Sequence, residues 1–266
     1  MACRHDQASR DTRAVCEPPG GAPPGATRLE RLLGALSASG HRGLSLLRDA
    51  LSPPRCAACG EPAPASAPFC AGCLATVEPP GAADGGLPIV GYGAYGGALR
   101  QAVQNLKYHD RPELGAPLGA LVAEVARGSL QGRVELVVPV PLHPRRLAER
   151  GYNQAALLAR PVARALGAAL GALVLERSRD TAAQARLAGR DRLANVAGAF
   201  HARRPERLAG RTVLLVDDVA TTGATLSACA AALAATGAVP IGAVVVALAG
   251  ARREPQVVSL RAPGCR

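Results

Sequence analysis

The sequence predicts an α/β protein with a largely parallel sheet, preceded by a small module of four cysteines. Short apolar runs rich in β-branched residues occur at 134–140, 213–216 and 239–248, and helical stretches lie between them. Alternating strands and helices are typical of a parallel sheet, whose ligands bind at the carboxyl ends of the strands. Polar motifs directly follow two of these runs, and paired cysteines precede all three. The chemistry is therefore expected at one edge of the sheet.

The composition fits one α/β domain with something small beside it. Of the 266 residues 48% are hydrophobic but only 2% are aromatic, so the core must consist mainly of Ala, Leu and Val. The net charge is +11, and 30 of the 31 cationic side chains are Arg, the exception being Lys107. A nucleic-acid partner fits this charge, although few aromatic side chains are available to stack on bases. With no apolar run of the roughly 18 residues that a span needs and no signal-peptide core, we predict a cytoplasmic protein without a membrane span.

The chain divides into four predicted regions. Residues 1–43 are expected to be a disordered extension, or the product of a start codon assigned too far upstream. Residues 44–80 form the cysteine module, and the main domain spans 87–250. A Pro/Gly-rich linker between them predicts two separate hydrophobic cores, and 251–266 is expected to be a frayed tail. The remaining cysteines receive no role: Cys3, Cys16, Cys229 and Cys265.

Four cysteines form two Cys-x-x-Cys pairs, Cys56 with Cys59 and Cys70 with Cys73, separated by ten residues. Each pair turns two thiolates toward one point, and two pairs complete a tetrahedral site for zinc. Because four protein ligands leave no position for water, such a zinc ion would be structural. Disulfides and a remnant that has lost its metal are the alternatives left open.

The stretch after the linker predicts an edge strand at 89–95 and a helix at 97–108 that ends in Leu106-Lys107-Tyr108. Because the chain otherwise uses only Arg for its cations, Lys107 is expected at a position where a compact point charge is needed, and we predict that it binds substrate. Chance retention of one lysine is the alternative.

A basic motif follows the predicted strand 134–140, itself preceded by a helix at 117–127. Arg145, Arg146 and Arg150 lie in or at the end of a loop at 141–150, and three arginines at a strand exit suit a pyrophosphate. A solvated basic turn would have the same sequence. A helix at 155–166, kinked at Pro161, and a strand at 172–175 are predicted next, followed by a polar run at 177–195.

The stretch 212–226 reads as a buried strand, two acids at its end, a polar turn and a helix that continues to about residue 235. The helix start, with the hydroxyls of Thr221, Thr222 and Thr225, offers a site for one phosphate. Asp217 and Asp218 would repel a phosphate, so they are expected to face sugar hydroxyls or a metal ion carried by the ligand. This arrangement has the size of a ribose 5-phosphate, whereas a buried strand with a solvated acidic turn is the simpler alternative.

The stretch resembles the loop of type I phosphoribosyltransferases that binds phosphoribosyl pyrophosphate, with the pattern D-D-x-x-T-T-G-x-T. Together with CAAC, CAGC, LKY, VPVPLHPRRLAERGYNQ and the polar pattern at 181–195, it resembles the ComF family. These are competence-associated proteins with an N-terminal zinc module and a type I phosphoribosyltransferase domain. The resemblance covers about residues 44–248, and the long N-terminal extension is the main departure.

The resemblance implies a phosphoribosyltransferase that binds phosphoribosyl pyrophosphate with Mg²⁺ and transfers the phosphoribosyl group to an unknown nitrogen acceptor or releases pyrophosphate. The alternative that it leaves open is a non-catalytic partner in DNA uptake that binds ligand, single-stranded DNA or DNA-uptake proteins. The oligomeric state stays open as well. The residue roles that the resemblance implies are ribose binding by Asp217 and Asp218, 5-phosphate binding by Thr221, Thr222, Gly223, Ala224 and Thr225, pyrophosphate binding by Arg145, Arg146 and Arg150, and a mobile loop with Gln184 and Arg190.

Overall fold

The computed structural model describes residues 54–81, 86–179, 198–250 and 260–261. Its contacts divide the chain into two units, Met1–Ser52 and Pro53–Arg266, and every described residue belongs to the second. The predicted N-terminal extension and most of the predicted tail lie outside the described residues, as do Cys3, Cys16, Gln184, Arg190 and Cys265.

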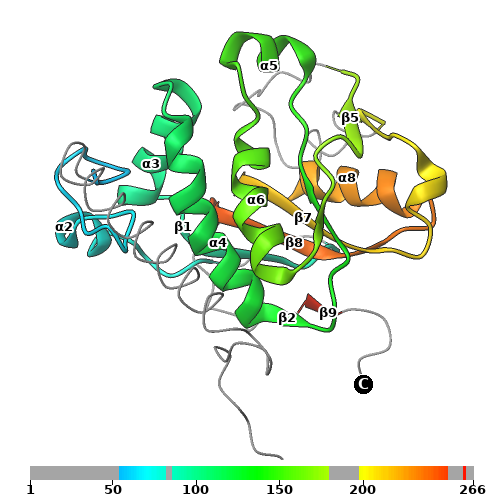
Figure 1. Ribbon diagram of the computed structural model, residues 1–266, viewed down its shortest axis with the longest axis horizontal. Helices are drawn as coiled ribbons and strands as arrows, with labels where there is room; N and C mark the ends of the chain where they lie inside the picture. The colour runs from blue at the N-terminus through cyan, green and yellow to red at the C-terminus, as the bar shows by residue number, and fades with distance from the viewer. Residues whose placement is uncertain (1–53, 82–85, 180–197, 251–259, 262–266) are drawn as a thin grey trace, which may run out of the picture. The chain divides into compact units, whose positions relative to one another are not determined.

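Five parallel strands form the central sheet in the order β1-β8-β7-β3-β4, which confirms the predicted fold class. The strands are β1 (Ile89–Ala94), β3 (Leu136–Pro139), β4 (Ala169–Leu170), β7 (Thr212–Ala220) and β8 (Val239–Leu248). As predicted, β1 lies at an edge, and the two longest strands, β7 and β8, pair at the centre (Figure 1). The carboxyl ends of β3 and β7 therefore open on the same edge of the sheet.

Helices cover both faces of this sheet. α3 (Gly97–Tyr108), α4 (Gly115–Ser129) and α6 (Gln154–Leu166) pack on one face, whereas α8 (Ala224–Ala234) and the hairpin of β5 (Leu175–Arg177) and β6 (Phe200–Ala202) pack on the other (Figure 1). Successive residues of a strand point to opposite faces, so Leu214 and Val216 of β7 join the core beneath α4 and α6. Val213 and Leu215 join the core beneath α8. The same alternation fixes the directions of the two acids that follow.

The remaining described elements are short: α2 (Ala71–Leu74), η1 (Pro112–Leu114), β2 (Leu130–Gln131), α5 (Pro144–Arg150), η2 (Pro205–Arg207) and β9 (Leu260–Arg261). Among the described helices, none is long and apolar enough to cross a membrane.

The predicted helices and strands coincide with the observed ones at most positions, but several bounds differ. The strand expected at 172–175 begins only at its last residue, Leu175, as β5, and the residues before it form a turn: Val174 N–H donates to the Gly171 carbonyl oxygen and Leu173 is exposed. The segment 141–150, expected as a loop, contains α5, which begins at a proline after His143, whose ring nitrogen accepts a hydrogen bond from the Arg145 backbone N–H. Pro161 lies inside α6, which continues through it.

The cysteine module shares one hydrophobic core with the main domain, which contradicts the expectation of two separate cores. Cys56 and Phe69 are buried in the same cluster as Leu99 and Leu106 of α3. A Pro/Gly-rich linker permits separation of two folded parts but does not enforce it when an apolar helix face lies within reach.

Candidate functional site

The acids Asp217 and Asp218 lie within β7 and not beyond its end, contrary to the sequence prediction. β8 is long enough to keep pairing past them, and Asp217 stands in register with Val245, and Ala220 with Leu248. Consecutive positions in a strand point to opposite faces, so the two carboxylates occupy different surroundings.

Asp218 is buried against α3 and forms an ion pair with the only lysine of the chain. Its Oδ1 lies 2.6 Å from Lys107 Nζ, with the two side chains 3% and 21% exposed, respectively. Burial by itself would lower the pKa of Lys107, but the charge of Asp218 and the hydrogen bond outweigh it, and the pKa is raised. Asp218 Oδ2 has no hydrogen-bond partner among the described residues. The expectation that both acids remain solvated is therefore wrong for Asp218.

Asp217 faces the α8 side of the sheet and is partly exposed. Its Oδ1 accepts a hydrogen bond of 2.8 Å from the backbone N–H of Asp218. Burial, and secondly the charge of Asp218, raise the pKa of Asp217 to about 7, against the opposing effect of Lys107. Near neutral pH this carboxyl can therefore exist in both protonation states.

The turn after β7 leads directly into the N-terminus of α8. Gly223 has a φ of +73°, and a Cβ at this position would lie 2.7 Å from Ile89 Cδ1 of β1. No side chain caps the helix, Thr221 is exposed, and Thr222 and Thr225 are partly exposed. Backbone N–H groups at an uncapped helix start, with hydroxyls beside them, can receive an anion.

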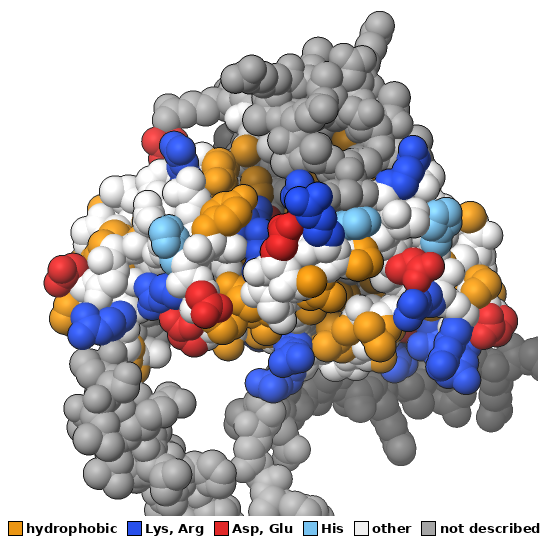
Figure 2. Space-filling model, turned by 90° about the horizontal axis from the view of Figure 1, so that it is seen from above, with side chains coloured by type: hydrophobic (Ala, Val, Ile, Leu, Met, Phe, Trp, Pro, Cys, Tyr) orange, Lys and Arg blue, Asp and Glu red, His pale blue; other side chains and the backbone are white. Residues whose placement is uncertain are grey.

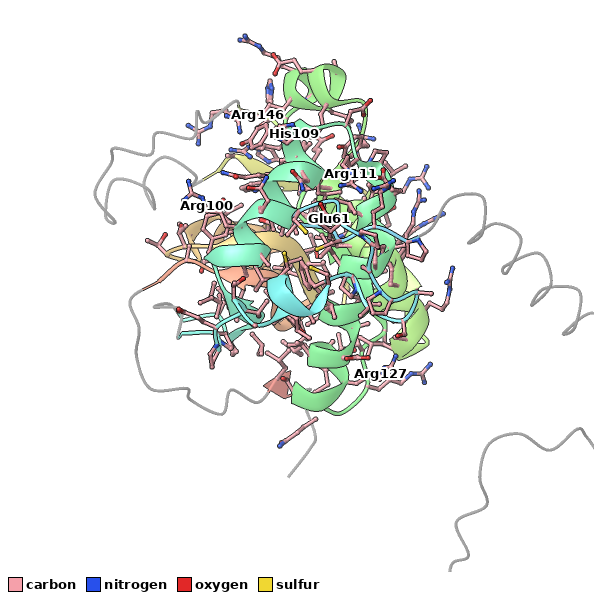
Figure 3. All side chains as sticks on the ribbon, turned by 90° about the vertical axis from the view of Figure 1, so that its left-hand side faces the viewer. Glu61, Arg100, His109, Arg111, Arg127 and Arg146 are labelled. Carbon is pink, nitrogen blue, oxygen red and sulfur yellow. The ribbon has the colours of Figure 1, made fainter. Side chains whose placement is uncertain are left out.

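The three arginines of the basic motif lie on α5, where Arg145 and Arg150 contact different neighbours. Arg145 is 74% exposed and pairs with Glu149 at 2.9 Å along the same helix. Arg150 donates to Gln154 Oε1, and its guanidinium carbon lies 5.4 Å from the centroid of the Tyr108 ring. Figure 3 shows Arg146 and His109 toward the same end of the molecule. Seen from above in Figure 2, basic side chains alternate with acidic and apolar ones and do not form a continuous basic patch.

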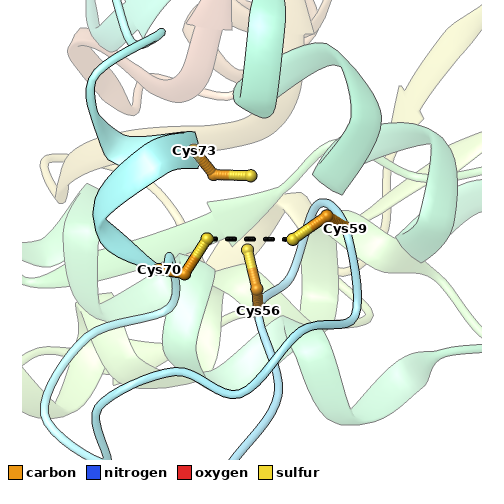
Figure 4. Close-up of side chains that lie close together, drawn as sticks. All are labelled: Cys56, Cys59, Cys70 and Cys73. Carbon is orange, nitrogen blue, oxygen red and sulfur yellow. Dashed lines mark hydrogen bonds between the residues drawn. The ribbon is translucent and has the colours of Figure 1, made fainter.

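The four cysteines of the N-terminal module converge in space. Cys56, Cys59, Cys70 and Cys73 are free thiols whose sulfur atoms all lie within 4.8 Å of one another (Figure 4). Cys59 Sγ and Cys70 Sγ are 3.8 Å apart, which matches the sulfur separation of about 3.8 Å expected around a tetrahedral zinc ion with bonds of about 2.3 Å. The donor set and spacing therefore fit a metal ion such as zinc.

The local fold explains this convergence. Gly60, with a φ of +80°, closes the first Cys-x-x-Cys turn by donating its N–H to the Cys56 carbonyl oxygen. Burial favours the neutral Cys56 thiol, but backbone N–H groups of Cys59, Cys70 and Ala58 outweigh burial and lower its pKa to about 6. Burial and the neighbouring sulfurs raise the pKa of Cys73 to about 12. One thiolate thus forms readily, and a bound cation would favour the others.

Sequence reasoning missed Asn105, which joins the cysteine module to α3. Its side-chain Nδ2 donates to the carbonyl oxygens of Ala57 at 2.8 Å and Ala58 at 2.9 Å. A sequence signal existed, since Asn105 lies three positions after Ala102 on the apolar stripe of the predicted helix. A polar residue on a core-facing stripe needs a buried partner.

Comparisons with known proteins give a family match and several relatives. Residues 153–260 match the family model described as the phosphoribosyl transferase domain. The chain is 35% identical to the DNA utilization protein YhgH of Salmonella typhimurium over 190 residues, which cover 70% of this chain and 80% of that protein. It is also 32% identical to competence protein F of Haemophilus influenzae over 179 residues, 65% of this chain and 76% of that protein.

A partial likeness to solved structures accompanies these matches. An allosteric regulatory enzyme of purine biosynthesis aligns with a TM-score of 0.37 and 19% identity, covering 53% of this chain and 29% of that one. The TT1426 protein of Thermus thermophilus aligns with a TM-score of 0.30 and 21% identity, covering 54% of this chain and 86% of that protein.

Proposed function

Because this chain belongs to the ComF family, we propose that it binds phosphoribosyl pyrophosphate with Mg²⁺ and acts as a phosphoribosyltransferase. The observation that carries the proposal is the sequence of groups along β7 and α8: an acid pair, a hydroxyl-bearing turn and an uncapped helix start at the ligand edge of a parallel sheet. A cytoplasmic location, where free thiols persist, completes the proposal.

Each part of the site receives the part of the ligand that suits its charge. The N–H groups at the start of α8 and the hydroxyls of Thr221, Thr222 and Thr225 would bind the 5-phosphate, with Gly223 and Ala224 supplying backbone donors. Asp217, which is partly exposed, would accept hydrogen bonds from the ribose hydroxyls, and on Asp218 the Oδ2 atom, which does not pair with Lys107, would be the acceptor. Cations would approach the pyrophosphate from Arg145, Arg146 and Arg150, whereas Gln184 and Arg190 lie outside the described residues.

The reaction needs no nucleophile from the protein. The bond between the anomeric carbon and the pyrophosphate oxygen breaks as a bond from the acceptor nitrogen forms, and the displaced pyrophosphate carries away the electron pair. Positive charge develops on the ribose ring near Asp217, whose ionised form would stabilise it. Holding the two reactants in line supplies much of the remaining rate increase. Mg²⁺, when bound, would offset charge on the departing pyrophosphate oxygens.

The cysteine module is proposed to hold one structural zinc ion. Cys56, Cys59, Cys70 and Cys73 supply four sulfur ligands and leave no open position for water or substrate, so this ion would take no part in the chemistry.

Pyrophosphate release tests the proposal. Purified protein with Mg²⁺ and phosphoribosyl pyrophosphate should release pyrophosphate in the presence of at least one member of a panel of bases. Gly223→Ala should weaken ligand binding, because a φ of +73° is strained for a residue with a Cβ, and relief of that strain would displace the helix start. Absence of calorimetric binding by the wild-type protein would overturn the proposal. Binding without release for any base would reduce it to ligand binding alone.

A second candidate function, a non-catalytic role as a DNA-binding partner in DNA uptake, is favoured by Tyr108. All six aromatic residues of the chain are described, and Tyr108, at 70% exposure, is the only exposed one. An exposed ring beside the Arg150 guanidinium suits stacking with an unpaired base. Tyr108→Ala should then weaken binding of single-stranded DNA by about 1–3 kcal/mol, whereas Tyr108→Phe should not. Equal DNA affinity of both variants and wild type would exclude this role for Tyr108.

A further inference from the structure

Three successive residues near the C-terminal end of α3 bind three different parts of the protein. Asn105 donates to the Ala57 and Ala58 carbonyl oxygens in the cysteine module. The Leu106 carbonyl oxygen accepts a hydrogen bond of 2.6 Å from the Tyr152 hydroxyl, just before α6. Lys107 Nζ lies 2.6 Å from Asp218 Oδ1 on β7. The end of α3 is therefore a junction between the cysteine module and the acid pair.

The Asn105 side chain uses both of its hydrogen-bond donors at this junction. Its Oδ1 accepts a hydrogen bond of 3.1 Å from Gln101 Nε2. Only 8% of the residue is exposed, so water cannot readily replace a lost partner. A change in the module must therefore either move the end of α3 or leave a buried amide unpaired.

The carbonyl groups that Asn105 binds belong to the metal-ligating turn itself. Ala57 and Ala58 are the two residues between Cys56 and Cys59, so their orientation follows the orientation of those two sulfur ligands. Lys107 lies two residues beyond Asn105 in a hydrogen-bonded helix, and displacement of one carries the other with it. The pair that Lys107 makes is also the contact that fixes Asp218, whose Oδ2 has no hydrogen-bond partner among the described residues.

We propose that the cysteine module, through Asn105, positions the Lys107–Asp218 pair, so that metal occupancy of the module controls the affinity of the ligand site. Asn105 is thus a positioning residue, which acts through Lys107 without touching the ligand. The effect of zinc on ligand affinity rests on the proposed function, whereas its effect on the Lys107–Asp218 pair does not.

The single lysine makes the ion pair directly observable. Labelling with ¹³C,¹⁵N-lysine gives one side-chain signal, that of Lys107, in the NMR spectrum of the full chain. In zinc-loaded protein this signal should report an ion-paired ammonium group, and removal of zinc by a chelator should move it toward its position in Asp218→Asn. Asn105→Ala should shift the Lys107 signal in zinc-loaded protein. Removing zinc from that variant should cause little further shift of the signal. Arg100→Ala, an exposed position of α3 that points outward in Figure 3, should keep the wild-type response.

Two results would overturn the coupling. One is an unchanged Lys107 signal in protein that metal analysis shows to be zinc-free. The other is a full response to zinc removal in Asn105→Ala. Should stripped protein unfold, competition with a chromophoric chelator replaces the stripping experiment. Asp218→Asn should then weaken zinc retention in the wild-type background and leave it unchanged in the Asn105→Ala background, because coupling between two sites is reciprocal. Zinc retention that Asp218→Asn leaves unchanged in both the wild-type and the Asn105→Ala backgrounds would also overturn the coupling.

Calorimetry with phosphoribosyl pyrophosphate and Mg²⁺ tests the consequence for the ligand. Zinc removal should lower the affinity of wild-type protein about fivefold or more, the lower end of typical couplings, and should change that of Asn105→Ala less than about twofold. Equal affinity of loaded and stripped wild-type protein would overturn this part. A loaded wild-type protein that binds no phosphoribosyl pyrophosphate would instead overturn the proposed function, and the Lys107 signal would still decide the coupling.

Discussion

Lys107 Nζ lies 2.6 Å from Asp218 Oδ1, and this contact joins the only lysine of the chain to the second acid of the β7 motif. Asp218 is 3% exposed and Lys107 is 21% exposed, so water reaches the lysine more readily than the acid. A lysine presents a compact point charge, whereas the planar guanidinium of arginine pairs with both oxygens of a carboxylate at once. The contact here joins one nitrogen to one oxygen, and Lys107 therefore occupies a position where a point charge is used.

Breaking this pair should destabilise the fold. Asp218→Asn leaves the Lys107 charge partly buried without its partner, which should lower the free energy of unfolding by about 3 kcal/mol in urea titrations. Lys107→Met should have a similar cost. The double variant should lose less than the sum of the two single losses, because it leaves no unpaired charge. A midpoint for Asp218→Asn equal to that of wild type would show that the contact contributes nothing to stability.

Asp217 should make stability depend on pH between about 4 and about 7. Its folded pKa of about 7 lies above the ordinary value of 3.8, so the folded protein keeps a proton that the unfolded chain has released. The stability that this group contributes is therefore present at low pH and is lost as the pH rises through this window. Asp217→Asn cannot titrate, so it should gain stability relative to wild type from about pH 5 to about pH 8. A constant difference between the two urea midpoints across these pH values would contradict the raised pKa.

Zinc loss should destabilise the whole described domain and not the cysteine module alone. We expect one zinc ion per chain in protein purified under reducing conditions without chelators. Cys56→Ser should abolish zinc binding. It should also lower the midpoint temperature of a single unfolding transition, because Cys56 is packed in the same core as α3. Cys229→Ala, a buried thiol on the opposite face of the sheet, should keep full zinc content. Two separate transitions in Cys56→Ser would restore the expectation of independent cores.

Arg146 and Arg145 form a matched pair on α5 for testing pyrophosphate contact. Arg146→Ala should weaken binding of phosphoribosyl pyrophosphate by about 1.5–3 kcal/mol, the range of a hydrogen bond to a charged group. Arg145→Ala should cost less, since the Arg145 side chain is 74% exposed and its charge is screened by water, whereas Arg146 is only partly exposed. Calorimetry and DNA binding should be measured on the same samples. Unchanged ligand affinity with weakened DNA affinity in Arg146→Ala would favour the DNA-uptake role.

The sequence by itself determined the layered fold and the chemistry of its motifs. Short β-branched runs and helical stretches follow from local periodicity, so α3 at 97–108 and β8 at 239–248 have the predicted bounds. The spacing of Cys56, Cys59, Cys70 and Cys73 likewise predicted their convergence, because Cys-x-x-Cys turns are local structures. The order of the motifs also placed the acid pair in the C-terminal half of its strand, although inside the strand and not beyond its end.

Only the tertiary structure decided what each motif contacts. The length of β8 keeps Asp217 and Asp218 inside the ladder and turns them to opposite faces, which no pattern within β7 encodes. The burial of Asp218 depends on Lys107, over a hundred residues earlier, and the junction at Asn105 depends on the docking of the cysteine module against α3. These contacts join segments distant in sequence, and they arise because apolar faces must be covered during packing, whereas periodicity reports only which face is apolar.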